Sequence, residues 1–176
     1  TVLTDQNTVT LDLNTGATTA RALAGALTAS GHASSLTASA AGASGDLTSS
    51  VATTGDSTLS ADASASNTGE VQGRLQITAA GPIDSRGRVV GDATLTSTSG
   101  GAIAHAANVD GLLTTDTSGA TRLSGTLGSL AVVHSAALNF DNSTTINGTA
   151  AIAASGALSQ SPTAPLIVSG PLTINA

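Results

Sequence analysis

The sequence predicts an all-β fold and favours a parallel β-helix of stacked coils. Short runs alternate apolar and polar residues, and glycines with small polar residues separate them. In addition, residues 146–154 read I-N-G-T-A-A-I-A-A and residues 168–176 read V-S-G-P-L-T-I-N-A, so Gly148 matches Gly170 and Ile152 matches Ile174. A position-specific match 22 residues apart is typical of a solenoid, whose coils stack at about 4.8 Å.

The first strand is predicted within residues 8–13. Val9, Leu11 and Leu13 alternate with Thr10 and Asp12, which describes a half-buried strand. Turn-forming residues follow at 14–16. The segment 18–29 contains good helix formers, but Gly25 weakens a helix there.

Recurring glycines indicate one unit per coil along a single β-repeat domain that spans residues 1–176. Irregular intervals of 14 to 28 residues suit a solenoid with loops of varying length. Residues 1–69 show the repeat least clearly and residues 70–176 show it better, and residues 31–69 are expected to be irregular but extended. The glycines that open these units are Gly25, Gly45, Gly73, Gly91, Gly111, Gly125, Gly148 and Gly170.

An antiparallel arrangement is the alternative fold. Glycine turns recur closely enough in the first half to permit hairpins, and an antiparallel β-sandwich with an exchanged strand would use residues 2–13 as the donor. The match between the two C-terminal units favours the coil.

The C-terminal third also resembles a known family. Strand units of the form x-G-x-L-x-I-x-A and the turn S-G-A-L-S-Q-S at residues 155–161 are similar to repeats of filamentous-haemagglutinin-type and autotransporter passenger proteins. The resemblance is good over about 120–176, fair over 70–119 and poor before 70. It implies a secreted right-handed β-helix that acts as an adhesin or stalk, and it carries over no catalytic residue.

The composition argues against several function classes. Five basic residues, a net charge of −6 and one aromatic residue leave neither the cations nor the stacking platforms that nucleic-acid binding requires. There is no cysteine, and no apolar run approaches the length of a membrane-spanning helix. The acidic residues are scattered singly, whereas carboxylate catalysis needs a close pair. We therefore expect no enzyme, no cofactor and no metal site.

Individual polar residues are expected to be structural. His32, His105 and His134 are far apart in the sequence and are predicted at the surface or in turns. Asp46, Asp56 and Asp92 each follow a glycine and are predicted to bond their own backbone in turns.

The expected function is a non-enzymatic, extracellular structural or adhesive protein at the cell surface that forms a fibre or filament. Its partners would be further copies joined by strand pairing, or the continuation of a longer chain, with a host or surface ligand as a further partner. The alternatives are a pilin-like subunit that donates a strand and an ice-binding β-solenoid, the latter because Thr-x-Thr occurs at residues 8–10, 94–96 and 96–98.

The two ends of the chain are predicted to make the contacts between copies. Both contain strands with few charges, so their backbone edges are free to pair with another strand. Ile152 and Ile174 are predicted to point inward, because they hold the same position in the repeated unit. The predicted contact residues are Val9, Leu11, Leu13, Leu172 and Ile174.

Overall fold

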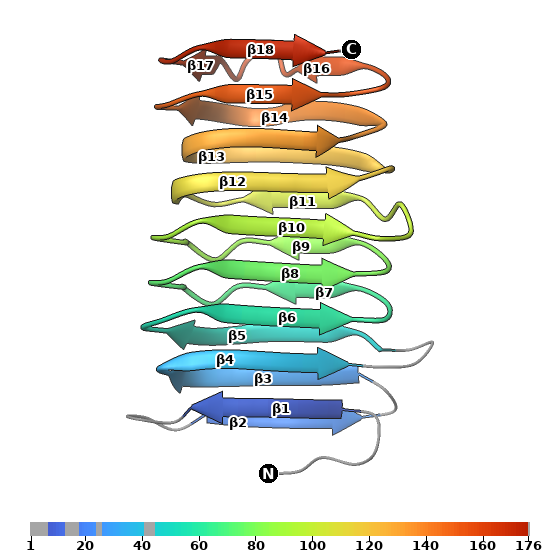
Figure 1. Cartoon of the computed structure of the whole chain (residues 1–176), viewed down its shortest axis with the longest axis vertical. Coiled ribbons are helices and arrows are strands. Elements are labelled where there is room, and N and C mark those ends of the chain that lie inside the picture. Colours follow the sequence, from blue (N-terminus) through green and yellow to red (C-terminus); the bar gives the residue numbers. More distant parts are fainter. Residues whose placement is uncertain (1–6, 13–17, 24–25, 41–44, 176) are drawn as a thin grey trace.

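The chain folds as a right-handed parallel β-helix in which coils stack along one long axis (Figure 1). This computed structural model describes residues 7–12, 18–23, 26–40 and 45–175. The strands are β1 (Asn7–Asp12), β2 (Thr18–Leu23), β3 (Ala26–Ala33), β4 (Ser35–Ala40), β5 (Leu47–Thr53), β6 (Ser57–Ala61), β7 (Ala65–Asn67), β8 (Leu75–Ala79), β9 (Ile83–Ser85), β10 (Ala93–Ser97), β11 (Ile103–Ala106), β12 (Val109–Thr117), β13 (Ala120–His134), β14 (Ala137–Ile146), β15 (Ala150–Ala153), β16 (Leu158–Gln160), β17 (Leu166–Val168) and β18 (Leu172–Asn175).

Two sheets face each other across the interior. The front sheet of Figure 1 contains β4, β6, β8, β10, β12, the end of β13, β15 and β18, and the back sheet contains β3, β5, β7, β9, β11, the start of β13, β14 and β16. From β3 onward the described strands pair in parallel. The alternative of an antiparallel sandwich is therefore wrong. The described residues within 18–29 belong to β2 and β3, which agrees with the argument that Gly25 weakens a helix there.

The first two described strands lie at the N-terminal end of the stack and have the opposite polarity. β1 pairs antiparallel with β4, and β2 pairs antiparallel with β3. The stack therefore begins with a layer of reversed strands on both sheets (Figure 1).

The C-terminal repeat occupies the register that the sequence predicts. Ile146 is the partner of Val168 and Ile152 is the partner of Ile174, so one coil separates the two copies. Ala150 pairs with Leu172 in the same ladder. The interval of 22 residues is thus the length of this coil.

One glycine per coil stacks at a single corner of the solenoid. Each amide from Gly73, Gly91, Gly111 and Gly148 donates to the carbonyl of the glycine one coil earlier. A Cβ atom on these glycines would meet the preceding coil's backbone or an aspartate beside it, so the corner has no room for a side chain. The prediction was wrong at two positions, because the stack contains Gly55 and Gly128 where the sequence suggested Gly45 and Gly125, and the predicted Gly25 lies outside the described residues. Its members are Gly55, Gly73, Gly91, Gly111, Gly128, Gly148 and Gly170.

Gly125 has a different role, at the bend of β13. This strand runs through the back sheet, turns and continues in the front sheet. Gly125 has φ +110°, which L side chains rarely adopt, and a Cβ atom at this position would meet the carbonyl of Ala107. Glycine at this position therefore lets one strand cross the corner without a loop.

The interior is filled by columns, which we define as residues that are Cα partners from strand to strand. From β4 to β15, alternate residues of the strands point inward for most of their length, so every coil adds one residue to each column. The Leu36 column contains Leu36, Ser57, Leu75, Ala93, Leu113, Leu130, Ala150 and Leu172, and the Ala38 column contains Ala38, Leu59, Ile77, Leu95, Thr115, Val132, Ile152 and Ile174. Most members of these two columns are aliphatic, and the hydroxyl residues Ser57 and Thr115 are the exceptions.

The segment for which the sequence predicts irregular extended structure joins this core through regular strands. Leu36, Leu47, Val51 and Leu59 are at most 1% exposed. They lie in β4, β5 and β6, which pair in parallel with strands of neighbouring coils. A few large aliphatic residues separated by alanine and serine are enough here, because each coil needs only a few inward positions.

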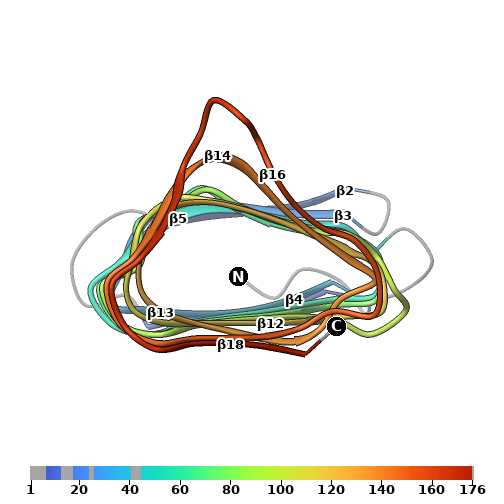
Figure 2. The ribbon, with the colours of Figure 1, turned by 90° about the horizontal axis from the view of Figure 1, so that it is seen from above.

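The coils widen towards the C-terminal end. The register between β13 and β14 shifts after Leu123, and the following coil separates β16 from β17 by a turn at Pro162 and Thr163. Seen along the axis, β14 and β16 bulge outward from the back sheet (Figure 2). Phe140, the single aromatic residue, is 1% exposed within β14.

Truncation of Ile152 and of Ile174 to alanine should have very different effects. Ile152 is 2% exposed, which confirms its inward position, whereas Ile174 is 44% exposed although it lies in the same column. Ile152→Ala should cost about 2–4 kcal/mol of unfolding free energy, and Ile174→Ala in the monomer less than about 1 kcal/mol. Urea unfolding of both variants at low protein concentration tests this, and equal costs would contradict the assigned columns.

Candidate functional site: the C-terminal rim

The strongest candidate for a functional surface is the last coil that the structure describes, made of β16, β17 and β18, which we call the C-terminal rim. Leu172, Ile174 and Leu158 are 47%, 44% and 39% exposed. Their column neighbours one coil earlier, Ala150, Ile152 and Leu138, are at most 2% exposed. These side chains belong to the core columns and are exposed because no described coil covers them.

The backbone edge of the rim is also open. β18 pairs with β15, and β16 and β17 pair with β14, and no other described strand pairs with them. The three strands read L-S-Q, L-I-V and L-T-I-N, with no charged residue. Charged side chains are a common device against unwanted edge pairing, and the rim has none. It therefore presents both an apolar surface and a ladder of hydrogen-bonding groups.

The predicted contact residues fall at opposite ends of the solenoid. Val9 and Leu11 lie in β1, while Leu172 and Ile174 lie in β18 (Figure 1). Leu13 lies outside the described residues. One chain therefore does not bring the two groups together, and a contact between them requires two copies.

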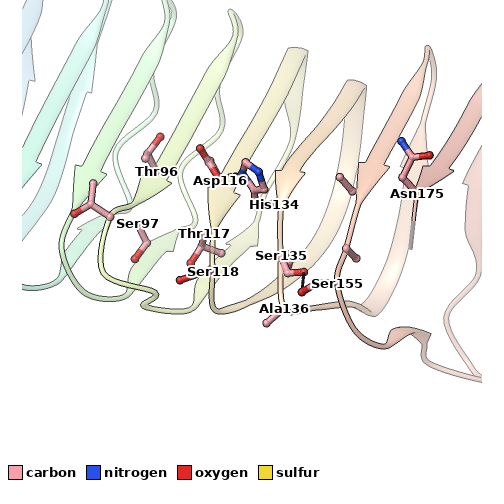
Figure 3. A pocket seen from close by; sticks show the side chains of 13 residues that line it. Thr96, Ser97, Asp116, Thr117, Ser118, His134, Ser135, Ala136, Ser155 and Asn175 are labelled. Atoms are coloured by element: carbon pink, nitrogen blue, oxygen red, sulfur yellow. Dashed lines mark hydrogen bonds and ion pairs between the residues drawn. The ribbon is translucent and has the colours of Figure 1, made fainter.

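A second candidate is an open hollow of about 690 Å³ at the corner that follows the front strands. Asp116 and His134 line it, with 2.9 Å between Oδ1 and Nδ1 (Figure 3). Both are exposed, and hydroxyls from Thr96, Ser118 and Ser155 surround them. This arrangement can hydrogen-bond a polar ligand. Within residues 7–12, 18–23, 26–40 and 45–175, no three His, Asp or Glu side chains converge as metal ligands would.

The aspartates that follow glycines connect neighbouring coils. Oδ1 of Asp56 accepts the Arg74 amide at 2.8 Å, and Oδ1 of Asp92 accepts the Leu112 amide at 2.8 Å. Asp46 bonds the amide and hydroxyl of Ser64 at 3.0 and 2.6 Å. The prediction that they bond their own backbone is therefore wrong. Each carboxylate stands immediately before the start of a strand and bonds a backbone amide of the next coil.

These bonds favour the charged carboxylate. The hydroxyl of Ser64, followed by its amide, lowers the pKa of Asp46 below its ordinary value. The amide of Arg74, followed by its guanidinium, does the same to the pKa of Asp56. Both groups thus contribute stability that is lost as the pH falls through their lowered pKa values, which is a structural role.

The described arginines are likewise used in ion pairs between or within coils. Arg74 pairs with Asp56, Arg86 with Asp84 and Arg122 with Asp141. Arg88 lies between Glu70 and Asp110, at 3.4 and 2.6 Å. These pairs neutralise charge along the rod, and among the four arginines whose side chains the structure describes, none is left without an ion pair.

The back sheet carries a polar column that the sequence did not suggest. Ser49, Asn67, Ser85 and His105 are consecutive Cα partners, each at most 1% exposed. Oδ1 of Asn67, Oγ of Ser85 and both ring nitrogens of His105 have no hydrogen-bond partner among the described residues. The prediction that His105 lies at the surface or in a turn is wrong. It follows the buried Ile103 by two residues on β11 and therefore faces the same, inward side.

Burial dominates the protonation of His105. It lowers the pKa of the imidazole from 6.5 to about 4, because the charged ring would lose its hydration. The backbone of Ala107 and the charge of Asp84 act in the opposite direction and are weaker. His105 is thus a neutral residue of the core.

Comparison with known proteins identifies no relative. No family model matches the chain, and neither curated proteins nor solved structures gave a match. Over the part of the chain that the structure describes, there is no helix of the length and apolarity that a bilayer crossing requires.

Proposed function

We propose that this protein is a non-enzymatic structural segment of an extracellular, cell-surface fibre, in which solenoids join end to end through the C-terminal rim. The observation that carries the proposal is the exposure of Leu172 and Ile174, members of columns that are otherwise buried. Covering them with another layer of strands would bury apolar surface and satisfy the open backbone edge together.

The rest of the molecule suits a rod. Its inter-coil bonds from Asp46, Asp56 and Asp92, and the ion pairs of Arg88, strengthen the stack along its axis. The resemblance of residues 120–176 to adhesin and stalk repeats agrees with this role. An adhesive contact with a host or surface ligand would then use the sides of the rod.

The test is imaging of the purified chain and of the variant Thr173→Lys/Asn175→Lys. These positions flank Ile174 on the rim, and lysines on an edge strand oppose strand pairing. The matched control is Thr94→Lys/Thr96→Lys, which places the same charges on β10 within the stack. We expect rods from the wild type and the control, and single solenoids from the rim variant, by negative-stain microscopy and sedimentation.

Two results would contradict the proposal. A wild type that stays monomeric at high concentration would show that solenoids do not join. Rods formed equally by both lysine variants would show that the joint lies elsewhere.

A second function, ice binding, is favoured by the outward face of the front sheet. Two outward columns cross β4, β6, β8, β10 and β12 without a break in register. Eight of their ten residues carry hydroxyls. The columns are Thr37, Thr58, Gln76, Thr94 and Thr114, and Ser39, Ser60, Thr78, Thr96 and Asp116.

Such an array repeats at the strand spacing of about 4.8 Å, and a repeating set of hydroxyls can match a repeating lattice of water. Thermal hysteresis of the purified protein, lost in Thr94→Lys/Thr96→Lys, would support this second function. Absence of hysteresis in the wild type would exclude it.

A further inference from the structure

The two ends of the solenoid terminate the same core columns. In the antiparallel pair of β1 and β4, Leu11 is the partner of Leu36 and Val9 is the partner of Ala38. The Leu36 column, followed strand by strand, ends at Leu172, and the Ala38 column ends at Ile174. Leu11 and Leu172 are therefore the two ends of one column, and Val9 and Ile174 are the two ends of the next.

From this coincidence we infer that copies join head to tail, with β1 of one copy paired antiparallel to β18 of the copy before it. The inference rests on the proposed fibre and specifies its joint. Continuing the columns across the joint places Leu11 opposite Leu172, Thr10 opposite Thr173 and Val9 opposite Ile174. β1 would then pair on one edge with its own β4 and on the other with its neighbour's β18.

The directions of the strands permit this pairing without any rearrangement. β18 runs in the same direction as β4, and β1 runs opposite to both (Figure 1). A copy translated along the axis therefore presents to β18 the same antiparallel partner that β4 already has. Among the described strands, β1 pairs with β4 alone, and the inferred joint uses its other edge.

The back sheet gives the same placement independently. β2 pairs with β3 so that Ala22 is the partner of Leu27 and Ala20 the partner of Ala29. The columns that begin at these positions end on β16, at Leu158 and Gln160. One translation thus continues both sheets, with β2 over β16 and β1 over β18.

The symmetry of this contact determines whether the assembly is closed or open. The two surfaces are different, so the contact is heterologous, and a translation along the axis does not close into a ring. Assembly would produce an open filament whose coils continue from copy to copy. A two-fold contact between two C-terminal rims would instead produce a dimer and stop.

The experiment uses the absence of cysteine from the sequence. Thr10→Cys/Thr173→Cys carries one thiol on each side of the inferred joint, at positions that the register places opposite each other. With a short bis-maleimide, we expect a ladder of covalent multimers on a denaturing gel. The control Thr10→Cys/Thr94→Cys has its second thiol in the same outward column as Thr173, several strands away from the rim, and should remain monomeric.

The single variant Thr173→Cys and microscopy together distinguish failure of the inferred joint from failure of the proposed fibre. Thr173→Cys alone should give no covalent dimer, and an efficient dimer from it would establish the two-fold contact and overturn the head-to-tail joint. Rods seen by microscopy without a covalent ladder would overturn the register while the fibre stands. If neither rods nor a ladder form, both proposals fail.

Discussion

Replacement of His105 by leucine is expected to remove much of the acid sensitivity of this fold between pH 6.5 and pH 4. His105 is 1% exposed, its ring nitrogens have no partner among the described residues, and burial lowers its pKa to about 4. Leucine is the residue that follows it in the column, as Leu123. The substitution therefore introduces a side chain that this part of the core already accepts.

The direction follows from proton linkage. In the folded protein the imidazole stays neutral down to about pH 4, whereas in the unfolded chain it binds a proton below about pH 6.5. The unfolded state is therefore favoured progressively as the pH falls through this window. The loss attributable to His105 should reach about 3 kcal/mol near pH 4.

The residues that surround His105 do not obscure its effect on stability between pH 6.5 and pH 4. Ser85 and Leu123, its partners on β9 and β13, do not titrate, and Asp84 beside it acts weakly. The lowered pKa values of Asp46 and Asp56 place their effect below about pH 3.8. The two kinds of group can therefore be separated by pH.

Urea unfolding at pH 7, 5.5 and 4.5 measures the effect. As the pH is lowered, the free energy of unfolding should decrease steeply in the wild type and only weakly in His105→Leu. The control variant His134→Gln, which replaces an exposed histidine, should behave like the wild type. At pH 7 the leucine variant should be at least as stable, because two unsatisfied nitrogens are removed. Identical pH profiles for His105→Leu and the wild type would contradict the buried neutral histidine.

Gly87→Ala is expected to destabilise the solenoid by about 3 kcal/mol or more. A Cβ atom at this position would lie 1.9 Å from the carbonyl oxygen of Gly69 and 2.9 Å from Nδ2 of Asn67. The carbonyl is held in place, because it accepts a hydrogen bond from Asn67 at 3.0 Å. This carbonyl is part of the backbone and cannot rotate out of the way as a flexible side chain could. The two coils would therefore have to separate, and such overpacking is strongly destabilising.

Gly81→Ala is the matched comparison. Its Cβ atom would lie 3.1 Å from the carbonyl oxygen of Ala63, so a shift of a few tenths of an ångström accommodates it. Neither glycine has a positive φ, and the pair therefore tests space alone. Thermal unfolding should show a much larger loss for Gly87→Ala, and similar losses would mean that the spacing of the coils is not fixed at this corner.

The sequence predicts the fold where the repeat is regular. The match of Gly148 with Gly170 and of Ile152 with Ile174 reports the true register, because the coil between them is repeated without interruption. At Gly45 and Gly125 the same reasoning chose the wrong glycine. Glycine is frequent in this sequence, and only the stacked backbone decides which glycines must lack a side chain.

The polar interior could not be predicted. Ser49, Asn67 and His105 are residue types that usually lie at surfaces or in turns, and only strand register places them in the core. The inter-coil role of Asp56 was missed for a similar reason, since its acceptor bond joins residues 18 apart. The contact role of the strands near both ends stays a prediction, which rests on their alternating pattern and few charges.

The short intervals between paired residues also bear on how the chain reaches its structure. From β3 onward, each ladder joins residues about one coil apart, from Ala120 with Ala137 to Ala150 with Leu172. Each new coil can therefore dock on the previous one as soon as it has been synthesised, without waiting for distant sequence. The growing edge is then always the most recent coil, and its exposed column residues are the template on which the next coil forms.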